Sequence, residues 1–465
     1  MALNQSDTDA PPIIALVNKI LAKALQDDVS DIHIEPLEYA LRIRFRKDGV
    51  LYQAFDLLPK KFSPAVVSRF KIMANIDISE RRISQTGKIQ RNFNGNSLDF
   101  QVSTLPSRYG EKVVLQLFDN GQIQLSLDDL IIDQKTILTV KRLAESSSGL
   151  ILVTGTTDSR LTTLYSILAE RNNVSVNIVT VEDPIKYTLP GITQILALQE
   201  KGCDFAPVLR SIMAQDPDIV LVSEIPDQET AKIAVEIASR GCLVLIGFQA
   251  NDTADAIKGL AKMGIEPYKI SNTLKGVITQ SSMRRLCECR ISYTPNKAEI
   301  SRFNLSPSLT ETATFYQAKT LNSEEIAEAK KQDTLCPQCH GIGYKGRIEA
   351  YEVLTISEHL QTLIIENASG EQVKAAAVAE EMTTLLTYSL NLVQQGYTTF
   401  EEVERLIFND AILNTELQAK HENSLSPDVK VESQASDPWQ RIQELEKQLA
   451  TLISQFKQLK KELKN

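Results

Sequence analysis

The stretch LILVTGTTDSRLTTLYSIL, residues 150–168, decides the fold. An apolar, strand-like run ends in a loop of Gly, Thr and Ser, and a run with helical spacing follows. This is the layout of a phosphate-binding P-loop, in which backbone N–H groups and a helix N-terminus surround the phosphates. Similar apolar runs recur with helical stretches between them, in VNIVTVEDP (176–184), PDIVLVSE (217–224) and CLVLIGF (242–248). They predict a doubly wound α/β domain with a parallel sheet covered on both faces.

The P-loop pattern G-x-x-x-x-G-K-[ST] falls on residues 155–162 and fits only in part. Gly155 and Thr162 match, whereas Arg160 and Leu161 stand where the second Gly and the Lys are expected. The Lys supplies a positive charge to the phosphates, and losing one electrostatic contact of this kind costs about 10² to 10³ in rate. The sequence therefore predicts a P-loop scaffold with a damaged phosphate site.

The chain of 465 residues is long enough for more than one domain. We expect a polar tail over 1–12 and a small α/β domain over 13–120, which begins with an amphipathic helix over 13–26. The stretch LRIRFRKDGVLY (41–52) alternates apolar and basic residues around a Lys-Asp-Gly turn and predicts a hairpin. Its arginines, Arg42, Arg44 and Arg46, form either a solvated sheet face or an interface for an acidic partner.

The main domain is expected over 121–415, and a different composition follows it. Residues 416–437 are polar and predict a disordered linker. Residues 438–465 predict a coiled coil, because apolar residues recur there in alternating steps of three and four. The alternative is a helix that docks onto its own chain. The heptad positions are Ile442, Leu445, Leu449, Leu452, Phe456, Leu459 and Leu463.

Composition narrows the choice of partners and compartment. The net charge of −9 and the pI of about 5.3 argue against general attraction to nucleic acid, so no nucleic-acid partner is expected, although a local basic patch remains open. No apolar run is long enough to cross a bilayer. These features predict a cytoplasmic protein, and six cysteines in a chain of this length do not form a disulfide framework.

Four cysteines fall in two close pairs, Cys287 with Cys289 and Cys336 with Cys339. Two such pairs on separate turns are the usual layout of a tetrahedral zinc site. Four sulfur ligands leave no open coordination position, so the Zn²⁺ would be structural. The adjacent His340 could replace a ligand or could be a plain turn residue. The remaining two cysteines, Cys203 and Cys242, are expected to be inert core thiols.

From residue 30 to about residue 354 the chain resembles the ATPases of type II secretion and type IV pilus assembly, a family of hexameric P-loop motors. Seven segments carry the resemblance, in the family's order. They are SDIHIEP (30–36), SRFKIMANIDISERRISQTGKI (68–89), VSTLPSRYGEKVVLQLFD (102–119), TVEDPIKY (180–187), QDPDIVLVSEIPDQETAKIA (215–234), KGVITQSSMRRLC (275–287) and CPQCHGIGYKGRIEAYEVL (336–354).

The resemblance implies a RecA-like domain and assigns roles to individual residues. Glu182 matches the carboxylate that orients or deprotonates the attacking water, and Glu224 matches the Walker B acid that holds Mg²⁺ through water. Arg81 and Arg82 match arginines that the small domain directs toward the nucleotide. A zinc-binding insertion is implied at about 284–350. The residues expected to cradle ATP and Mg²⁺ are Gly155, Thr156, Thr157, Ser159, Arg160, Thr162 and Thr163.

The chain also departs from the family at the same pocket. Gln249 in GFQAND (247–252) replaces a histidine, and Pro226 replaces an arginine. Asp158 and Arg160 replace glycines that let the backbone approach the phosphates. Arg160 could stand in for the Lys missing at Leu161, but its guanidinium is bulky and starts one residue early. In the small domain Thr86 and Lys88 replace an Asp and an Arg. We therefore expect weak or lost ATP and Mg²⁺ binding, with little or no hydrolysis.

These features predict a catalytically impaired member of the family that serves as a regulatory or structural subunit of a pilus or secretion machine. Its expected partners are copies of itself or an active paralogue in hexamers, an inner-membrane platform protein, and an unknown protein at the coiled coil. Attachment to the inner membrane would then be peripheral, through protein partners. We expect the family's additional N-terminal docking domain to be missing, because only about a dozen residues precede the first predicted helix. Two alternatives stay open: an active hexameric ATPase that powers pilus extension or secretion, and a coiled-coil adaptor on an inactive motor scaffold.

Overall fold

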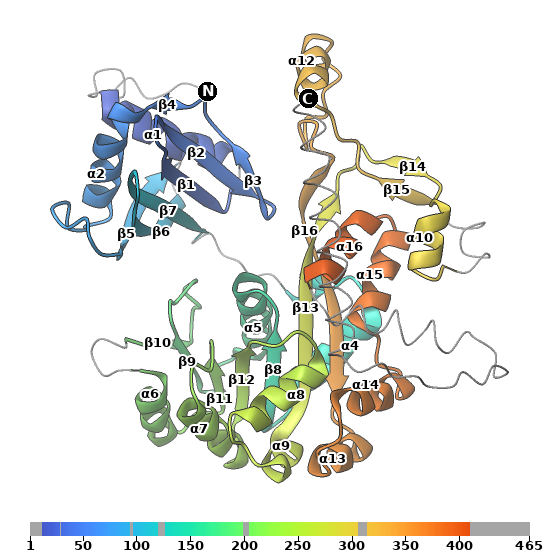
Figure 1. Cartoon of the computed structure of the whole chain (residues 1–465). Helices are drawn as coiled ribbons and strands as arrows, with labels where there is room; N and C mark the ends of the chain where they lie inside the picture. Colours follow the sequence, from blue (N-terminus) through green and yellow to red (C-terminus); the bar gives the residue numbers. More distant parts are fainter. Residues whose placement is uncertain are drawn as a thin grey trace, which may run out of the picture. The chain divides into compact units, whose positions relative to one another are not determined.

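A computed structural model of the chain describes residues 12–409 except 28, 94–95, 120–125, 199–203 and 306–313 (Figure 1). The predicted linker, the predicted coiled coil and Cys203 lie outside the described residues. Within the described part, none of the helices is long and apolar enough to cross a bilayer.

The N-terminal domain is an antiparallel sheet of seven strands with helices packed on it. The strand order is β3-β2-β1-β7-β6-β5, and β4 also pairs with β2. The first helix lies where the periodicity predicts it and buries Val17, Ile20, Leu21 and Ala24. The elements are α1 (Pro12–Gln26), β1 (Asp31–Pro36), β2 (Ala40–Lys47), β3 (Val50–Gln53), β4 (Leu58–Pro59), the 3₁₀ helix η2 (Lys60–Phe62), α2 (Ser63–Met73), β5 (Gln85–Phe93), β6 (Asn96–Ser107) and β7 (Gly110–Asp119).

The predicted basic hairpin is present as β2 and β3, and its arginines have partners inside the domain. Glu35 of β1 is buried and accepts hydrogen bonds from Arg42 Nε at 3.0 Å and from Arg44 Nη2 at 2.8 Å, and it pairs with Lys112 at 3.1 Å. Arg46 donates to the carbonyl oxygen of Gly49 at 2.8 Å. The alternating pattern left open whether these arginines face solvent or an acidic partner, and in the structure Arg42 and Arg44 both pair with Glu35 of the same domain.

The second domain contains the predicted parallel sheet. Its order is β10-β9-β11-β12-β8-β13-β16; only β16 runs antiparallel, against β13. The strands are β8 (Gly149–Thr154), β9 (Ile178–Glu182), β10 (Thr193–Leu196), β11 (Ile219–Val222), β12 (Leu243–Phe248), β13 (Leu274–Leu286) and β16 (Tyr344–Thr355). The helices before and between these strands are α3 (Leu127–Leu130), α4 (Gln134–Ala144), α5 (Thr157–Arg171), α6 (Phe205–Ile212), the 3₁₀ helix η4 (Met213–Gln215), α7 (Gln228–Ser239), α8 (Thr253–Lys262) and α9 (Pro267–Thr273).

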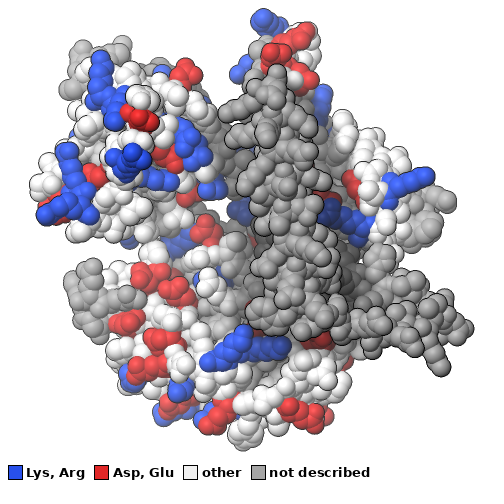
Figure 2. All heavy atoms as spheres, viewed as in Figure 1, with Lys and Arg blue, Asp and Glu red and all other residues white. Residues whose placement is uncertain are grey.

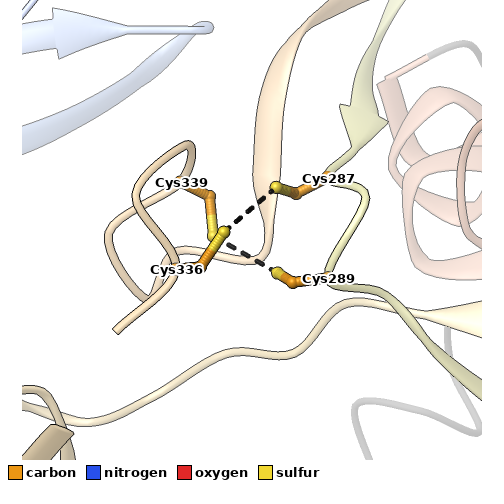
Figure 3. A group of neighbouring side chains, drawn as sticks. All are labelled: Cys287, Cys289, Cys336 and Cys339. Carbon is orange, nitrogen blue, oxygen red and sulfur yellow. Dashed lines mark hydrogen bonds between the residues drawn. The ribbon is translucent and has the colours of Figure 1, made fainter. Parts of the chain in front are cut away.

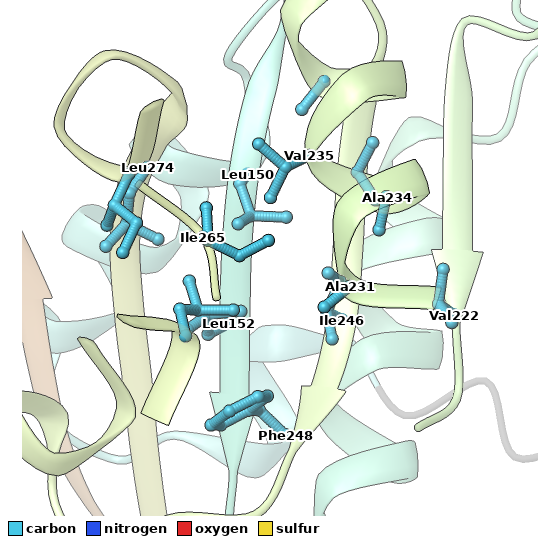
Figure 4. Close-up of a cluster of buried hydrophobic side chains, with 14 of the residues drawn as sticks. Leu150, Leu152, Val222, Ala231, Ala234, Val235, Ile246, Phe248, Ile265 and Leu274 are labelled. Carbon is cyan, nitrogen blue, oxygen red and sulfur yellow. The ribbon is translucent and has the colours of Figure 1, made fainter. Parts of the chain in front are cut away.

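Burial on both faces explains why these strands are continuously apolar. Every residue of β8, β11 and β12 is buried. Alternate residues of the strands, such as Leu150, Val222 and Ile246, pack with Ala231 and Val235 of α7 in one cluster (Figure 4). The residues between them point to the other side of the sheet, where α5 contacts β8, β12 and β13. The core therefore fixes the position of the strands, and α5 packs against the opposite face of the same sheet.

The region between β13 and β16 is an insertion with a two-stranded sheet of its own, and helices complete the domain after β16. The insertion contains β14 (Ile291–Tyr293), α10 (Lys297–Arg302), β15 (Phe315–Gln317) and α12 (Ser323–Lys331). The final helices are α13 (Glu358–Ile365), α14 (Gly370–Ala379), α15 (Leu385–Gln394) and α16 (Phe400–Asn409).

Charge is distributed unevenly over the surface. Lys and Arg side chains are spread over the viewed face of the N-terminal domain, whereas acidic side chains gather on the part of the second domain that holds α6 and α7 (Figure 2). The net charge of −9 therefore coexists with a locally basic surface.

Candidate functional site

Four neighbouring parallel strands end at one edge of the second sheet, and the residues expected at the nucleotide follow or close these strands. Gly155 follows β8, Glu182 closes β9, Glu224 lies two residues beyond β11, and Gln249 directly follows β12. The carboxyl ends of the strands are where open α/β sheets bind ligands. The fold thus brings the candidate residues of this domain to a common edge.

The turn from β8 into α5 is tight and depends on Gly155. Its φ is +136°, and a Cβ atom there would lie 2.7 Å from the carbonyl oxygen of Gln280. Thr156 is the N-cap, α5 begins at Thr157, and the N–H of Arg160 donates to the carbonyl oxygen of Thr156 at 2.9 Å. Residues 157–160 therefore form the first turn of a helix, and the Arg160 N–H is used inside that helix.

The polar side chains of this first turn have partners within the domain. The Lys186 ammonium donates to the Asp158 carboxylate. Ser159 Oγ accepts from Gln280 Nε2 at 2.8 Å, and Gln280 Oε1 accepts from Thr163 Oγ1 at 2.6 Å. Lys186 is thus the counter-charge of Asp158, the residue that replaces a glycine of the family's loop.

Arg160 and Leu161 are both turned into the domain. Arg160 is 4% exposed, and its Nη1 donates to the carbonyl oxygen of Phe248 at 3.3 Å. Burial lowers the pKa of Arg160, and the nearby charge of Glu224 acts in the opposite direction. Leu161 is 3% exposed. The Thr162 hydroxyl, which would face Mg²⁺ in a P-loop, donates to the backbone oxygen of Asp158 at 3.0 Å.

Glu182 is fully buried, and three side chains donate to its carboxylate. The Tyr165 hydroxyl donates to Oε2, while Thr180 Oγ1 and Gln194 Nε2 donate to Oε1 at 2.5 and 3.0 Å. Burial raises the pKa of Tyr165, and the Glu182 charge raises it further. To accept a hydrogen bond from a water molecule, Glu182 would have to exchange one of these donors or use a remaining lone pair.

The remaining candidates at this edge are on the surface. Glu224, Pro226 and Gln249 are exposed. Glu224 is therefore free to face a ligand from the solvent side, and it also lies close enough to Arg160 to stabilise the guanidinium charge.

Arg81 and Arg82 lie in the N-terminal domain, in the segment that leads into β5. Arg82 donates to Glu80 through Nη2 at 2.7 Å, and this hydrogen bond lowers the pKa of Glu80 to about 2. Arg81 is exposed. Thr86 and Lys88 lie on β5 itself.

The two cysteine pairs meet in one cluster (Figure 3). Cys287 and Cys289 follow β13, and Cys336 and Cys339 lie on the turn before β16. The Sγ atoms of Cys287 and Cys336 are 3.7 Å apart and those of Cys289 and Cys339 are 3.5 Å apart, with all four within 4.8 Å. A tetrahedron with Zn–S distances of about 2.3 Å has S···S edges of about 3.8 Å, whereas a disulfide needs about 2.05 Å. The cluster fits a four-sulfur metal site.

The surroundings of the cluster hold it in place. The Cys287 N–H donates to the carbonyl oxygen of Gly343 at 3.0 Å. Backbone N–H groups, first that of Cys339, lower the pKa of Cys336 to about 7, whereas burial raises the pKa of Cys287 and Cys289. His340 is exposed with a φ of +51°, as expected of a turn residue. Cys242 lies apart, with Sγ 3.0 Å from the carbonyl oxygen of Pro217.

Comparison with known proteins agrees with this fold. A family model described as type II/IV secretion system protein matches residues 6–405. The chain is 40% identical to the type II secretion system ATPase E of Vibrio cholerae over 87% of this chain and 77% of that protein. It is 38% identical to the type IV pilus assembly ATPase PilB of Myxococcus xanthus, over 85% and 68% of the two chains.

Solved structures show the same fold at low identity. The pilus retraction motor PilT with bound ADP superposes with a TM-score of 0.55 at 22% identity, over 83% of this chain and 96% of that one. The Legionella pneumophila ATPase DotB gives 0.60 at 15% identity, over 86% and 98%.

The fold and the strand-edge site thus define a P-loop ATPase architecture. The chain belongs to the type II/IV secretion system protein family, as the family model and the relatives show.

Several residues at the site were not identified from the sequence. Lys186, Gln194 and Gln280 come from distant positions, and only the fold brings them to Asp158, Glu182 and Ser159. The sequence also offers no reason to assign Tyr165 to the site, because an aromatic residue in a helix with an apolar face is expected to lie in the core.

Proposed function

We propose that this chain is a catalytically impaired subunit of a type IV pilus assembly or type II secretion machine, with a regulatory or structural role. Family membership supports the kind of machine. The impairment is inferred from the first turn of α5.

One observation carries this proposal: the segment that should surround the phosphates is bonded to the protein itself. α5 starts at Thr157, Asp158 pairs with Lys186, Ser159 bonds to Gln280, and Arg160 is buried. The positive charge expected at Leu161 is replaced by an apolar side chain in the core. A triphosphate would have to displace these contacts and would find fewer donors.

Any remaining nucleotide binding would use the same edge. The Gly155 turn, Thr156 and Thr157 would offer backbone N–H groups, with Ser159, Arg160, Thr162 and Thr163 nearby. ATP supplies the reactive γ-phosphate and Mg²⁺ neutralises its charge. On the protein side, Thr162 and Glu224 would hold Mg²⁺, and Glu182 would orient a water molecule. Arg81 and Arg82 would add positive charge from the N-terminal domain.

We further propose that Cys287, Cys289, Cys336 and Cys339 bind one structural Zn²⁺. The S···S spacing supports zinc over disulfides, and a complete set of four sulfur ligands leaves no position for a substrate.

By resemblance to the family, the chain would join hexamers with itself or with an active paralogue. It would contact an inner-membrane platform protein and remain cytoplasmic, with peripheral attachment to the membrane. An unknown partner would bind at residues 438–465. A variant of this proposal is an adaptor that uses the family's ATPase domains only as a scaffold for residues 438–465. Whether these domains still assemble into hexamers distinguishes the two.

A second candidate is an active hexameric ATPase. It is favoured by the two acidic residues, because Glu182 and Glu224 both stand at the edge where the family's chemistry needs them. Turnover separates this candidate from the proposal.

The test is ATP binding and hydrolysis by the purified, zinc-loaded full chain over a range of Mg²⁺ concentrations, beside the Glu224→Gln variant. We expect no turnover above that of Glu224→Gln. Turnover that disappears in Glu224→Gln would refute the impairment and establish the active ATPase.

A rebuilt P-loop gives a second test. The triple variant Asp158→Gly, Arg160→Gly and Leu161→Lys restores the P-loop pattern and should recover nucleotide affinity. Hydrolysis should stay low because Gln249 and Pro226 are unchanged. Full turnover from these three changes would show that the residues around the loop matter less than proposed.

A further inference from the structure

The Arg160 side chain is buried beside the carboxyl ends of the parallel strands, where a nucleotide would bind. It is 4% exposed, whereas Asp158 in the same helical turn is exposed. Its Nη1 donates to the carbonyl oxygen of Phe248 at the end of β12. A Cβ atom at Gly247 would lie 2.8 Å from Arg160 Nε and 2.0 Å from the Ser223 oxygen. The guanidinium therefore packs closely against β12.

The guanidinium also lies beside the end of β11, because the Cβ position of Gly247 is close to both Arg160 Nε and the Ser223 oxygen. Glu224 follows β11 and attracts Arg160, which opposes the effect of burial on the guanidinium. Among the described residues, Arg160 Nε is buried without a hydrogen-bond partner. A buried cation with so few bonds depends on a nearby negative charge. One side chain of α5 thus packs on the end of β12 and lies beside the end of β11, which leads to Glu224.

In a P-loop site, the acid after this strand faces Mg²⁺ through water. An ion placed there would meet the guanidinium as a like charge and would compete with it for Glu224. Arg160 could bind phosphate only by leaving its contact with Phe248 and turning outward.

We propose that Arg160 is a built-in cation that takes the place of Mg²⁺ opposite Glu224 and keeps the site closed to Mg²⁺·nucleotide. This inference deepens the proposed function and rests on it. It gives Arg160 a role opposite to phosphate binding, because removing the side chain should open the site.

The first test measures the affinity for Mg²⁺·ADP with a fluorescent ADP analogue in the wild type, Arg160→Gly and Arg160→Lys. We expect Arg160→Gly to bind at least tenfold more tightly than the wild type and Arg160→Lys, which keeps a cation, to bind like the wild type. A phosphate-binding Arg160 predicts weaker binding in Arg160→Gly. Weaker or equal affinity in Arg160→Gly, including no detectable binding by either protein, overturns the proposal.

The second test needs no nucleotide. Glu224→Gln is compared in the wild-type and Arg160→Met backgrounds, because Met fills the buried space with a flexible apolar chain and preserves folding. We expect Glu224→Gln to lower the thermal midpoint in the wild-type background and to leave it unchanged or raise it in the Arg160→Met background. Additive shifts would mean that the two residues are not coupled, which overturns the proposal. Since ATP turnover is measured separately, an active wild type would refute the impairment without deciding this coupling.

Discussion

Glu35 shows how one carboxylate can organise several charges in the N-terminal domain. Burial alone would raise its pKa, but hydrogen bonds from Arg44, Lys112 and Arg42 outweigh this effect and lower the pKa to about 2. The same bonds orient two arginines of β2 along β1, so the hairpin and its neighbour share one electrostatic anchor. The alternation of apolar and basic residues predicted that the arginines share one face of β2. Their partner, Glu35, could be identified only from the register of β1 against β2.

The lowered pKa of Glu35 gives a pH-dependent stability. Its ordinary value is 4.5, so its contribution is complete above about pH 4.5 and is lost as the pH falls toward 2. Because Arg42, Arg44 and Lys112 are about one-third exposed, we expect Glu35→Gln to cost about 1–3 kcal/mol at neutral pH. Urea unfolding from pH 7 to pH 2.5 should show a flatter acid decline for Glu35→Gln than for the wild type. Parallel curves would mean that other acids cause the decline. Glu38→Gln, a change outside these ion pairs, is the control.

At the scale of elements, the turn from β8 into α5 depends on both a backbone conformation and a close contact. Gly155 has a φ of +136° and no space for a Cβ atom beside Gln280. Gly241 has a φ of +105° with nothing within 4 Å of its Cβ position. A comparison of the same substitution at these two glycines therefore separates the cost of the backbone conformation from the cost of the steric contact.

We expect Gly241→Ala to lower the free energy of unfolding by about 1–3 kcal/mol, the usual cost of such a conformation. Gly155→Ala should cost clearly more, because the contact adds to the strain. Denaturant unfolding of both variants, followed in the second domain, measures the difference. Equal losses would show that Gln280 moves away at little cost and that the turn is looser than its contacts indicate.

The same elements show what could be predicted from the sequence. Continuous apolar runs predicted β8, β9, β11 and β12 and therefore the edge where Gly155, Glu182 and Glu224 meet. The contacts of the first turn of α5 could not be predicted, because the partners Lys186 and Gln280 reach it from far along the chain. The cysteine spacing predicted the cluster, but not its link through Gly343 to the start of β16.

At the scale of the whole molecule, the chain has the family's fold, and we propose that one site within it is altered. The comparisons cover more than four-fifths of the chain, including both described domains. The buried strands and the cysteine cluster hold the second domain together through contacts within the chain. A chain of this kind could occupy a place in an assembly even if its own site is closed.

Zinc would then be a ligand on which the fold still depends, through the insertion between β13 and β16. We expect about one Zn²⁺ per chain by elemental analysis, lost in Cys289→Ser and retained in Cys242→Ser, whose cysteine lies outside the cluster. Removal by a chelator should increase hydrogen exchange over residues 284–350, because thiolates released from the metal no longer hold the two turns together. Exchange in the N-terminal domain should not change. A metal-free wild type with the same exchange pattern would show that hydrogen bonds such as that from Cys287 to Gly343 suffice without zinc.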